Sequence, residues 1–146
     1  MNETLETTPA ETEAAPASTP VAAPVASAPP INLYKKILNN AEVQIEEVPT
    51  EKVRVAMIPV GETRIELLEP MSEESAIAKF INEKGEGVHH IAVAVEDIKA
   101  SIGKLSSEGL RVLYPEPRPG SQGKMITFIH PKSTKGVLLE LCQLPK

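Results

Sequence analysis

The 146-residue sequence has no tryptophan, two tyrosines, two phenylalanines and one cysteine, Cys142. A single cysteine cannot form an internal disulfide, so a reducing cytoplasm is the expected compartment. No apolar run reaches the roughly 18 residues typical of a transmembrane helix, so no membrane is expected as a partner. Few aromatic residues and no basic patch among them also argue against nucleic-acid binding.

The 14 prolines are concentrated at the start of the chain. Residues 1–30 hold six prolines, eight alanines and four glutamates, without Lys, Arg or an aromatic residue. The stretch lacks the basic residues of a secretory signal or a transit peptide. It also has too little large apolar surface to offset the entropy of ordering, so we predict that it is disordered. Residues 31–146 are predicted to form one domain.

Helices and strands can be predicted along residues 31–146. A helix is predicted at 31–38, a second after Ser72 and a third after Asp97, because Ser and Asp are favoured N-cap residues. Strands are predicted from alternation and flanking turn residues at 41–48, 53–59, 64–68, 88–95, 110–114, 124–130 and 136–143.

The two halves of this pattern resemble each other. The second half has the order βαβββ, and in the first half Met57-Ile58 and the strand after it parallel Phe128-Ile129 and the strand that follows. Where the second half has the strand 88–95, the first has the proline-rich stretch 20–30, which is unsuited to a sheet interior. The predicted fold class is therefore α+β, two βαβββ modules of which the first is incomplete.

Three polar residues stand out on the predicted strands. Alternation places His90 on a face with small alanines, Glu66 on a face with Leu68, and Glu140 on a face with Leu138. A carboxylate in such surroundings is costly to bury unless it is paired or metal-bound. A divalent-metal site is one interpretation. The alternatives are a hydrogen-bonded structural His90 and, for the glutamates, an exposed edge position or an ion pair with Arg64 or a lysine.

Other polar residues have two interpretations each. A cluster of basic and hydroxyl residues forms either a phosphate-binding patch or a solvated loop; its members are Lys124, Lys132, Ser133 and Lys135. His130 is expected to make a hydrogen bond at a strand end. Cys142 is expected to be a small core residue.

Four segments of the sequence resemble the methylmalonyl-CoA epimerases, within the vicinal oxygen chelate (glyoxalase-like) superfamily. They are IPVGETRIELLEP at 58–70, SAIAKFINEKGEGVHHIAVAVEDI at 75–98, EPRPGSQGK at 116–124 and FIHPKSTKGVLLELCQ at 128–143. The resemblance extends from Tyr34 to Gln143. It implies a glyoxalase-like curved sheet built from paired βαβββ modules around a metal.

The resemblance also implies a set of site residues. Glu66, His90 and Glu140 match metal ligands of the family, and the fourth ligand, a histidine on the opening strand, has no counterpart here. The expected metal is Co²⁺ or Mn²⁺, with Mg²⁺ or Zn²⁺ as alternatives. Some members carry a glutamate where this chain has Val55; the nearest carboxylate is Glu51 in the preceding turn, so the second acid/base group stays open.

The implied activity is that of an isomerase acting on an acyl-CoA. It would invert C2 of methylmalonyl-CoA by a metal-assisted proton transfer, as expected in propionate metabolism, with Glu140 as one acid/base group. The basic cluster would meet the CoA phosphates, and a homodimer is expected.

The unmatched opening strand leaves three alternatives. The enzyme is active, with the strand supplied by a partner subunit or with three metal ligands. The chain is a non-catalytic binding module. Alternatively, the start site or reading frame of the sequence is misplaced, and the true sequence is that of a complete epimerase. A glyoxalase-type lyase is a further candidate.

Overall fold

The computed structural model describes residues 30–39 and 42–145. Residues 1–29 lie outside this range. The predicted disorder of residues 1–30 and the possible opening strand therefore concern, except for Pro30, residues that the structure does not describe. The helices are α1 (Ile31–Leu38), α2 (Ala76–Lys84) and α3 (Ile98–Ser107), with short 3₁₀ turns η1 (Ser121–Gly123) and η2 (Pro131–Ser133). The strands are β1 (Gln44–Val48), β2 (Val53–Val60), β3 (Thr63–Pro70), β4 (Ile91–Ala94), β5 (Arg118–Pro119), β6 (Met125–Ile129) and β7 (Leu139–Gln143).

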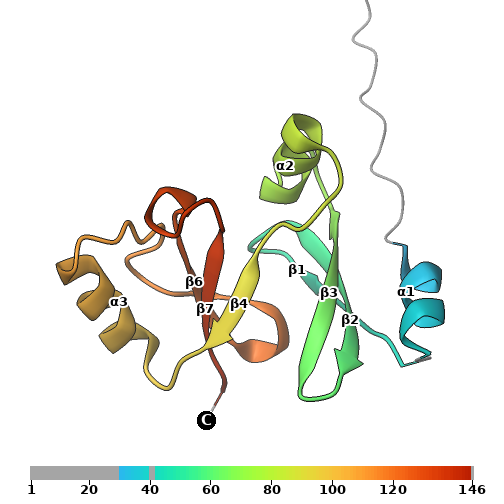
Figure 1. Cartoon of the computed structure of the whole chain (residues 1–146), viewed down its shortest axis with the longest axis horizontal. Helices are drawn as coiled ribbons and strands as arrows, with labels where there is room; N and C mark the ends of the chain where they lie inside the picture. Colours follow the sequence, from blue (N-terminus) through green and yellow to red (C-terminus); the bar gives the residue numbers. More distant parts are fainter. Residues whose placement is uncertain (1–29, 40–41, 146) are drawn as a thin grey trace, which may run out of the picture.

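The strands form two sheets that lie side by side (Figure 1). The first has the order β1-β2-β3 and the second the order β4-β7-β6-β5. All neighbouring strands are antiparallel except β4 and β7, which are parallel. Helices α1 and α3 lie at opposite ends of the molecule, each beside its own sheet. This α+β arrangement confirms the predicted fold class.

The two modules repeat at the level of strand register. Glu66 on β3 lies opposite Met57 on β2, and Glu140 on β7 lies opposite Phe128 on β6. The parallel that the sequence suggested between the two strand pairs is therefore confirmed. Among the described residues the first module has no strand before its helix, whereas β4 precedes α3 in the second.

Alternation along β2 divides the first module into two apolar faces. Val55 and Met57 pack with Ile77 of α2 on one face. Ala56 and Ile58 belong to the apolar cluster on the other face. Helix α1 packs against this cluster through its predicted apolar side, which consists of Ile31, Tyr34 and Leu38. Because Glu66 lies opposite Met57, its side chain belongs to the α2 face, the same face as the candidate site.

Several predicted strands are shorter in the structure, and one is absent. The strand predicted at 88–95 begins only at Ile91, because its parallel partner β7 begins opposite it at Leu139. The segment predicted as a strand at 110–114 is wrong as such: it contributes one isolated bridge, between Val112 and Ile129. Prolines that cannot donate to a ladder follow at 115, 117 and 119, and they limit pairing in this region.

Strand β4 is an outer strand of the second sheet. Its β-branched residues are not packed under a helix, since Ile91 and Val93 are 53% and 40% exposed. Val95, the residue after β4, packs against the core around α3. No second strand covers the free edge of β4 among the described residues, which explains this exposure.

Helix α2 begins three residues later than predicted. Its N-cap is Ser75, whose hydroxyl accepts a hydrogen bond from the Ile77 N–H, and Ser72 instead lies in the preceding turn. The N-cap prediction for Asp97 is confirmed, because its carboxylate accepts from the Ala100 N–H. Within the described residues no helix is long and apolar enough to span a bilayer.

The position of the α2 cap predicts a difference between two serines. Ser75 is buried, and its replacement by alanine removes the only side-chain acceptor of the first turn of the helix. We expect Ser75→Ala to lower the free energy of unfolding by about 1 kcal/mol, and Ser72→Ala to change it by less than about 0.5 kcal/mol. Urea denaturation measures both, and equal losses would contradict the assignment.

Candidate active site

A pocket of about 150 Å³ lies between the two sheets. Val55, Glu66 and Leu68 line it from the first sheet, and Phe128 and Glu140 line it from the second. Further contributions come from the loop before β4, which carries His89 and His90, and from the turn before β2, which carries Glu51. The three residues predicted as metal ligands, Glu66, His90 and Glu140, therefore line one pocket although they lie far apart in the sequence.

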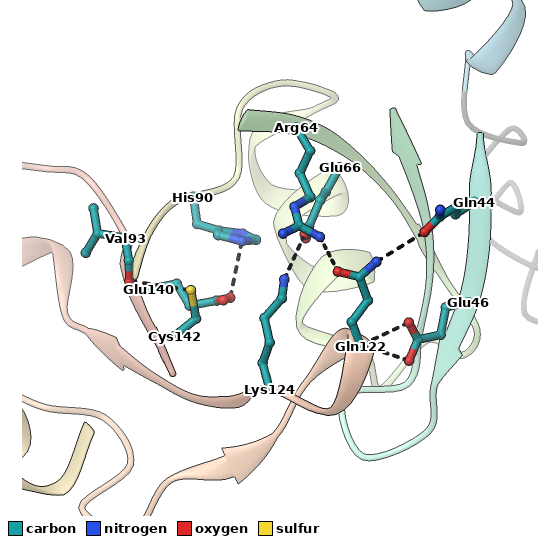
Figure 2. A network of polar contacts seen from close by, with 10 residues as sticks. All are labelled: Gln44, Glu46, Arg64, Glu66, His90, Val93, Gln122, Lys124, Glu140 and Cys142. Atoms are coloured by element: carbon teal, nitrogen blue, oxygen red, sulfur yellow. Dashed lines mark hydrogen bonds and ion pairs between the residues drawn. The ribbon is translucent and has the colours of Figure 1, made fainter. Parts of the chain in front are cut away.

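His90 and Glu140 are direct neighbours. The distance from His90 Nε2 to Glu140 Oε2 is 3.3 Å, and both side chains are nearly buried. Glu140 is fixed because β7 is an inner strand, paired with Ala92 of β4 and Phe128 of β6 at this position. The His90 ring also stands edge-on to Phe128. Figure 2 shows the imidazole pointing toward the carboxylate.

The pocket changes the protonation of both groups. Burial, with a smaller contribution from the nearby charge of Glu66, raises the pKa of Glu140 to about 7. Burial lowers the pKa of His90, which favours the neutral imidazole. The site therefore combines a carboxyl group with a pKa near neutral pH and a neutral imidazole, whose two ring nitrogens face Glu140 and His89.

The other glutamate of the predicted set has a different partner. Lys124 Nζ lies 3.6 Å from Glu66 Oε1, and the lysine is only 5% exposed (Figure 2). This is the ion pair with a lysine that the sequence left open as the alternative for Glu66. Lys124 was grouped with surface residues facing a phosphate, but it lies inside, next to the metal-ligand candidates.

A polar network holds the turn before Lys124 against the first sheet. The Gln122 backbone N–H donates to the Glu46 carboxylate at 2.9 Å, and its side chain donates to Gln44. The guanidinium of Arg64 donates to the Gln122 side-chain oxygen. These contacts, drawn in Figure 2, join the two sheets on the side of the pocket where Lys124 meets Glu66.

The remaining candidates lie away from the pocket. Lys132 and Lys135 are exposed on the loop between β6 and β7, and the Ser133 hydroxyl accepts from the Arg111 N–H. His130 Nδ1 accepts from the Lys132 N–H, which confirms the predicted strand-end hydrogen bond. Cys142 is a buried free thiol, as predicted.

Comparison with known proteins gives one consistent result. The Glyoxalase/Bleomycin resistance protein/Dioxygenase superfamily model matches residues 28–128. An ethylmalonyl-CoA/methylmalonyl-CoA epimerase of Cereibacter sphaeroides is 43% identical over 113 residues, which cover 76% of this chain and 84% of that protein. The mitochondrial methylmalonyl-CoA epimerase of Homo sapiens is 38% identical over 111 residues, 75% of this chain and 63% of the human one.

Solved structures agree. A methylmalonyl-CoA epimerase in complex with methylmalonyl-CoA and NH4⁺ matches with a TM-score of 0.75 and 40% identity, over 79% of this chain and 84% of that one. This chain belongs to the methylmalonyl-CoA epimerase family. The family recognised from the four sequence segments is therefore confirmed.

Epimerases of this superfamily use a divalent metal, and the pocket supplies suitable donor types. One imidazole and two carboxylates line it, and the raised pKa of Glu140 reflects a pocket that disfavours another negative charge unless a cation is near. His90 and Glu140 are already adjacent. In the described part of the chain, however, no three such residues stand close enough together to enclose an ion. Lys124 instead neutralises Glu66.

Two epimerase pocket residues were not predicted from the sequence. Strand alternation would put His89 on the opposite face from His90, but both line the pocket, and their Nδ1 atoms are 3.0 Å apart. Strand alternation does not apply to them because β4 begins after both. Tyr114 also lines the pocket, from a segment predicted as a strand. The adjacent histidines were the only signal in the sequence for His89, and no signal pointed to Tyr114.

The raised pKa of Glu140 predicts a pH-dependent cost in stability for the metal-free protein. In the unfolded chain this carboxyl ionises near pH 4.5, but in the folded chain only near pH 7. Stability is therefore lost as the pH rises through this window, by about 3 kcal/mol in total. Glu140→Gln cannot ionise, so its stability relative to the wild type should rise by that amount between pH 4.5 and pH 8.

Denaturation in the presence of a chelator measures this difference at both pH values. The matched control is Glu116→Gln, because this side chain is exposed and pairs only with the exposed Lys99. Its effect should not change with pH. A Glu140→Gln effect that is equally constant would contradict the buried, hard-to-ionise carboxyl.

Proposed function

We propose that this chain interconverts (R)- and (S)-methylmalonyl-CoA by moving a proton at C2. The observation that carries the proposal is the position of Glu140, nearly buried beside His90 in a pocket lined by both sheets. The relatives named above, and the substrate complex among the solved structures, support the same reaction.

Glu140 has the properties of a base for this step. The C2 proton lies next to a thioester carbonyl and a carboxylate, and a carboxylate base in water removes such a proton slowly. A general acid or base works best when its pKa is near the working pH. Burial raises the pKa of Glu140 to about 7. Apolar side chains such as Val55, Leu68 and Phe128 also line the pocket and would limit the access of water to the carbanion-like state.

A divalent metal ion, when bound, would supply a Lewis acid that stabilises the developing enolate. Glu66, His90 and Glu140 are the residues that would hold it, and we propose Co²⁺ or Mn²⁺, with Mg²⁺ or Zn²⁺ as alternatives. His90 is kept neutral by burial and so has a lone pair for a metal. Binding would require Glu66 to release Lys124, since the two are paired in this structure.

The larger part of the substrate extends out of the pocket, whose volume suits only the acyl end. The exposed Lys132 and Lys135, with Ser133 between them, are the proposed contacts for the CoA phosphates. Lys124 differs, because its ammonium is buried against Glu66; we propose that it serves the acyl end rather than the phosphates.

Two further properties are proposed. A homodimer is in keeping with the free, partly apolar edge of β4, where Ile91 and Val93 are exposed. A reducing, cytoplasmic location is in keeping with the single unpaired Cys142.

A non-catalytic binding module is the second candidate function. The ion pair between Lys124 and Glu66 favours it, because a lysine ammonium beside a ligand carboxylate competes with a metal ion. Activity of the purified protein separates the two candidates.

Catalysis by Glu140 can be tested by substitution. Glu140→Gln should lower the rate of epimerisation by at least about 100-fold, since a carboxamide cannot accept the C2 proton. Glu62→Gln, an exposed change in the turn between β2 and β3, is the charge-matched control and should keep the wild-type rate. The change in optical rotation as one epimer converts into the other measures the rate. An unchanged rate in Glu140→Gln would show that another residue is the base.

Metal binding can be tested with a pair of histidine variants. His90→Ala should weaken Co²⁺ or Mn²⁺ binding at least about 10-fold. Even the loss of a residue that only hydrogen-bonds to a metal ligand can weaken metal binding by this factor. His130→Ala is the control, because His130 lies outside the pocket at the end of β6. Calorimetric titration measures both. Equal affinities, or no binding by the wild type at micromolar metal, would contradict the proposed ligand set.

A further inference from the structure

The proposed reaction needs two acid/base groups, one on each face of C2. Glu140 reaches the pocket from the second sheet, so its counterpart must come from the opposite wall. The pocket-lining residues of β2 are Val53 and Val55, and neither can carry a proton. The second group therefore has to come from another element of the first module.

Among the described residues, two carboxylates line this opposite wall, Glu51 and Glu66. Glu66 is engaged by the buried ammonium of Lys124. Glu51 lies in the turn between β1 and β2, where its backbone N–H donates to the Val48 carbonyl. This hydrogen bond fixes the turn that leads into β2.

The Glu51 carboxylate is poorly satisfied. Its Oε1 atom is shielded from solvent and accepts no hydrogen bond. The ion pair with Arg118 Nη1 is 4.0 Å long, beyond hydrogen-bond distance. The Arg118 guanidinium instead lies over the Tyr114 ring, 3.7 Å from its centroid. A buried carboxylate oxygen without a donor is costly unless the site has a use for its lone pairs.

Electrostatics also connects Glu51 with the pocket. Its charge contributes, behind burial and Glu66, to the raised pKa of Glu140. It contributes in the same direction to the pKa of Tyr114, behind burial. Glu51 and Glu140 therefore line one pocket and are close enough for the charge of the first to affect the second.

We infer that Glu51 is the second acid/base group, facing C2 from the side opposite Glu140. The inference rests on the proposed function. One glutamate takes the C2 proton as the C–H bond breaks and the electron pair moves into the thioester carbonyl. The other, protonated, gives its proton to the opposite face as the carbonyl pair returns and the new C–H bond forms. The two glutamates end with exchanged protonation, and solvent restores them.

The test is solvent deuterium exchange, started separately from each epimer. In Glu51→Gln the epimerisation rate should fall at least about 100-fold, while Glu140 still exchanges the C2 proton of the one epimer that presents it. Glu140→Gln should show the mirror image, with exchange confined to the other epimer. Proton NMR at C2 measures both rates, and a merely structural role of Glu51 cannot produce this selectivity.

The controls keep the outcomes apart. Glu51→Asp keeps the charge and should retain more activity than Glu51→Gln, and Glu62→Gln should behave as the wild type. Two outcomes would overturn the role of Glu51 and leave the proposed function intact, provided that the wild type epimerises. In one, Glu51→Gln has the wild-type rate. In the other, Glu51→Gln loses exchange of both epimers to the same extent. A wild type that neither exchanges nor epimerises would overturn the proposed function itself.

Discussion

The site depends on the burial of a negative carboxyl group between two sheets. Glu140 is held on an inner strand, close to His90 and within the field of Glu66. Water cannot solvate its charge well there, so the group titrates near neutral pH. The neighbouring polar contacts limit the cost of this arrangement: a neutral imidazole next to Glu140, and a buried lysine next to Glu66. The chemistry proposed for the pocket follows from this balance of charge.

The fold supplies the geometry for that balance through repetition. Equivalent strand pairs in the two modules place Glu66 and Glu140 at equivalent positions, opposite Met57 and Phe128. Each glutamate then faces the pocket from its own sheet. The modules differ in the part that comes before the helix, where the described first module has no counterpart of β4. Three candidate ligands from the two modules line the pocket, and a buried lysine is paired with one of them, Glu66.

Much of this could be predicted from the sequence. The alternation around Glu66 and Glu140 and the internal repeat were sufficient for the fold class and for the faces of both glutamates. The position of a side chain was harder to predict where it depends on contacts with a segment far away in the sequence. His89 reaches the pocket because β4 can pair only from Leu139 onward, and Lys124 is buried because Glu66 lies beside it. Neither partner is near in sequence. The turn that aims Glu51 at the pocket is equally a product of how β1 pairs with β2.

The most direct measurement of the central claim is the fate of C2 when the wild-type protein, supplied with Co²⁺, meets (R)-methylmalonyl-CoA in deuterium oxide. We expect the (S) epimer to appear with deuterium at C2, because the proton removed on one face is replaced on the other by one that has exchanged with solvent. Substrate that keeps both its configuration and its C2 proton, with a protein that is folded and metal-loaded, would contradict it.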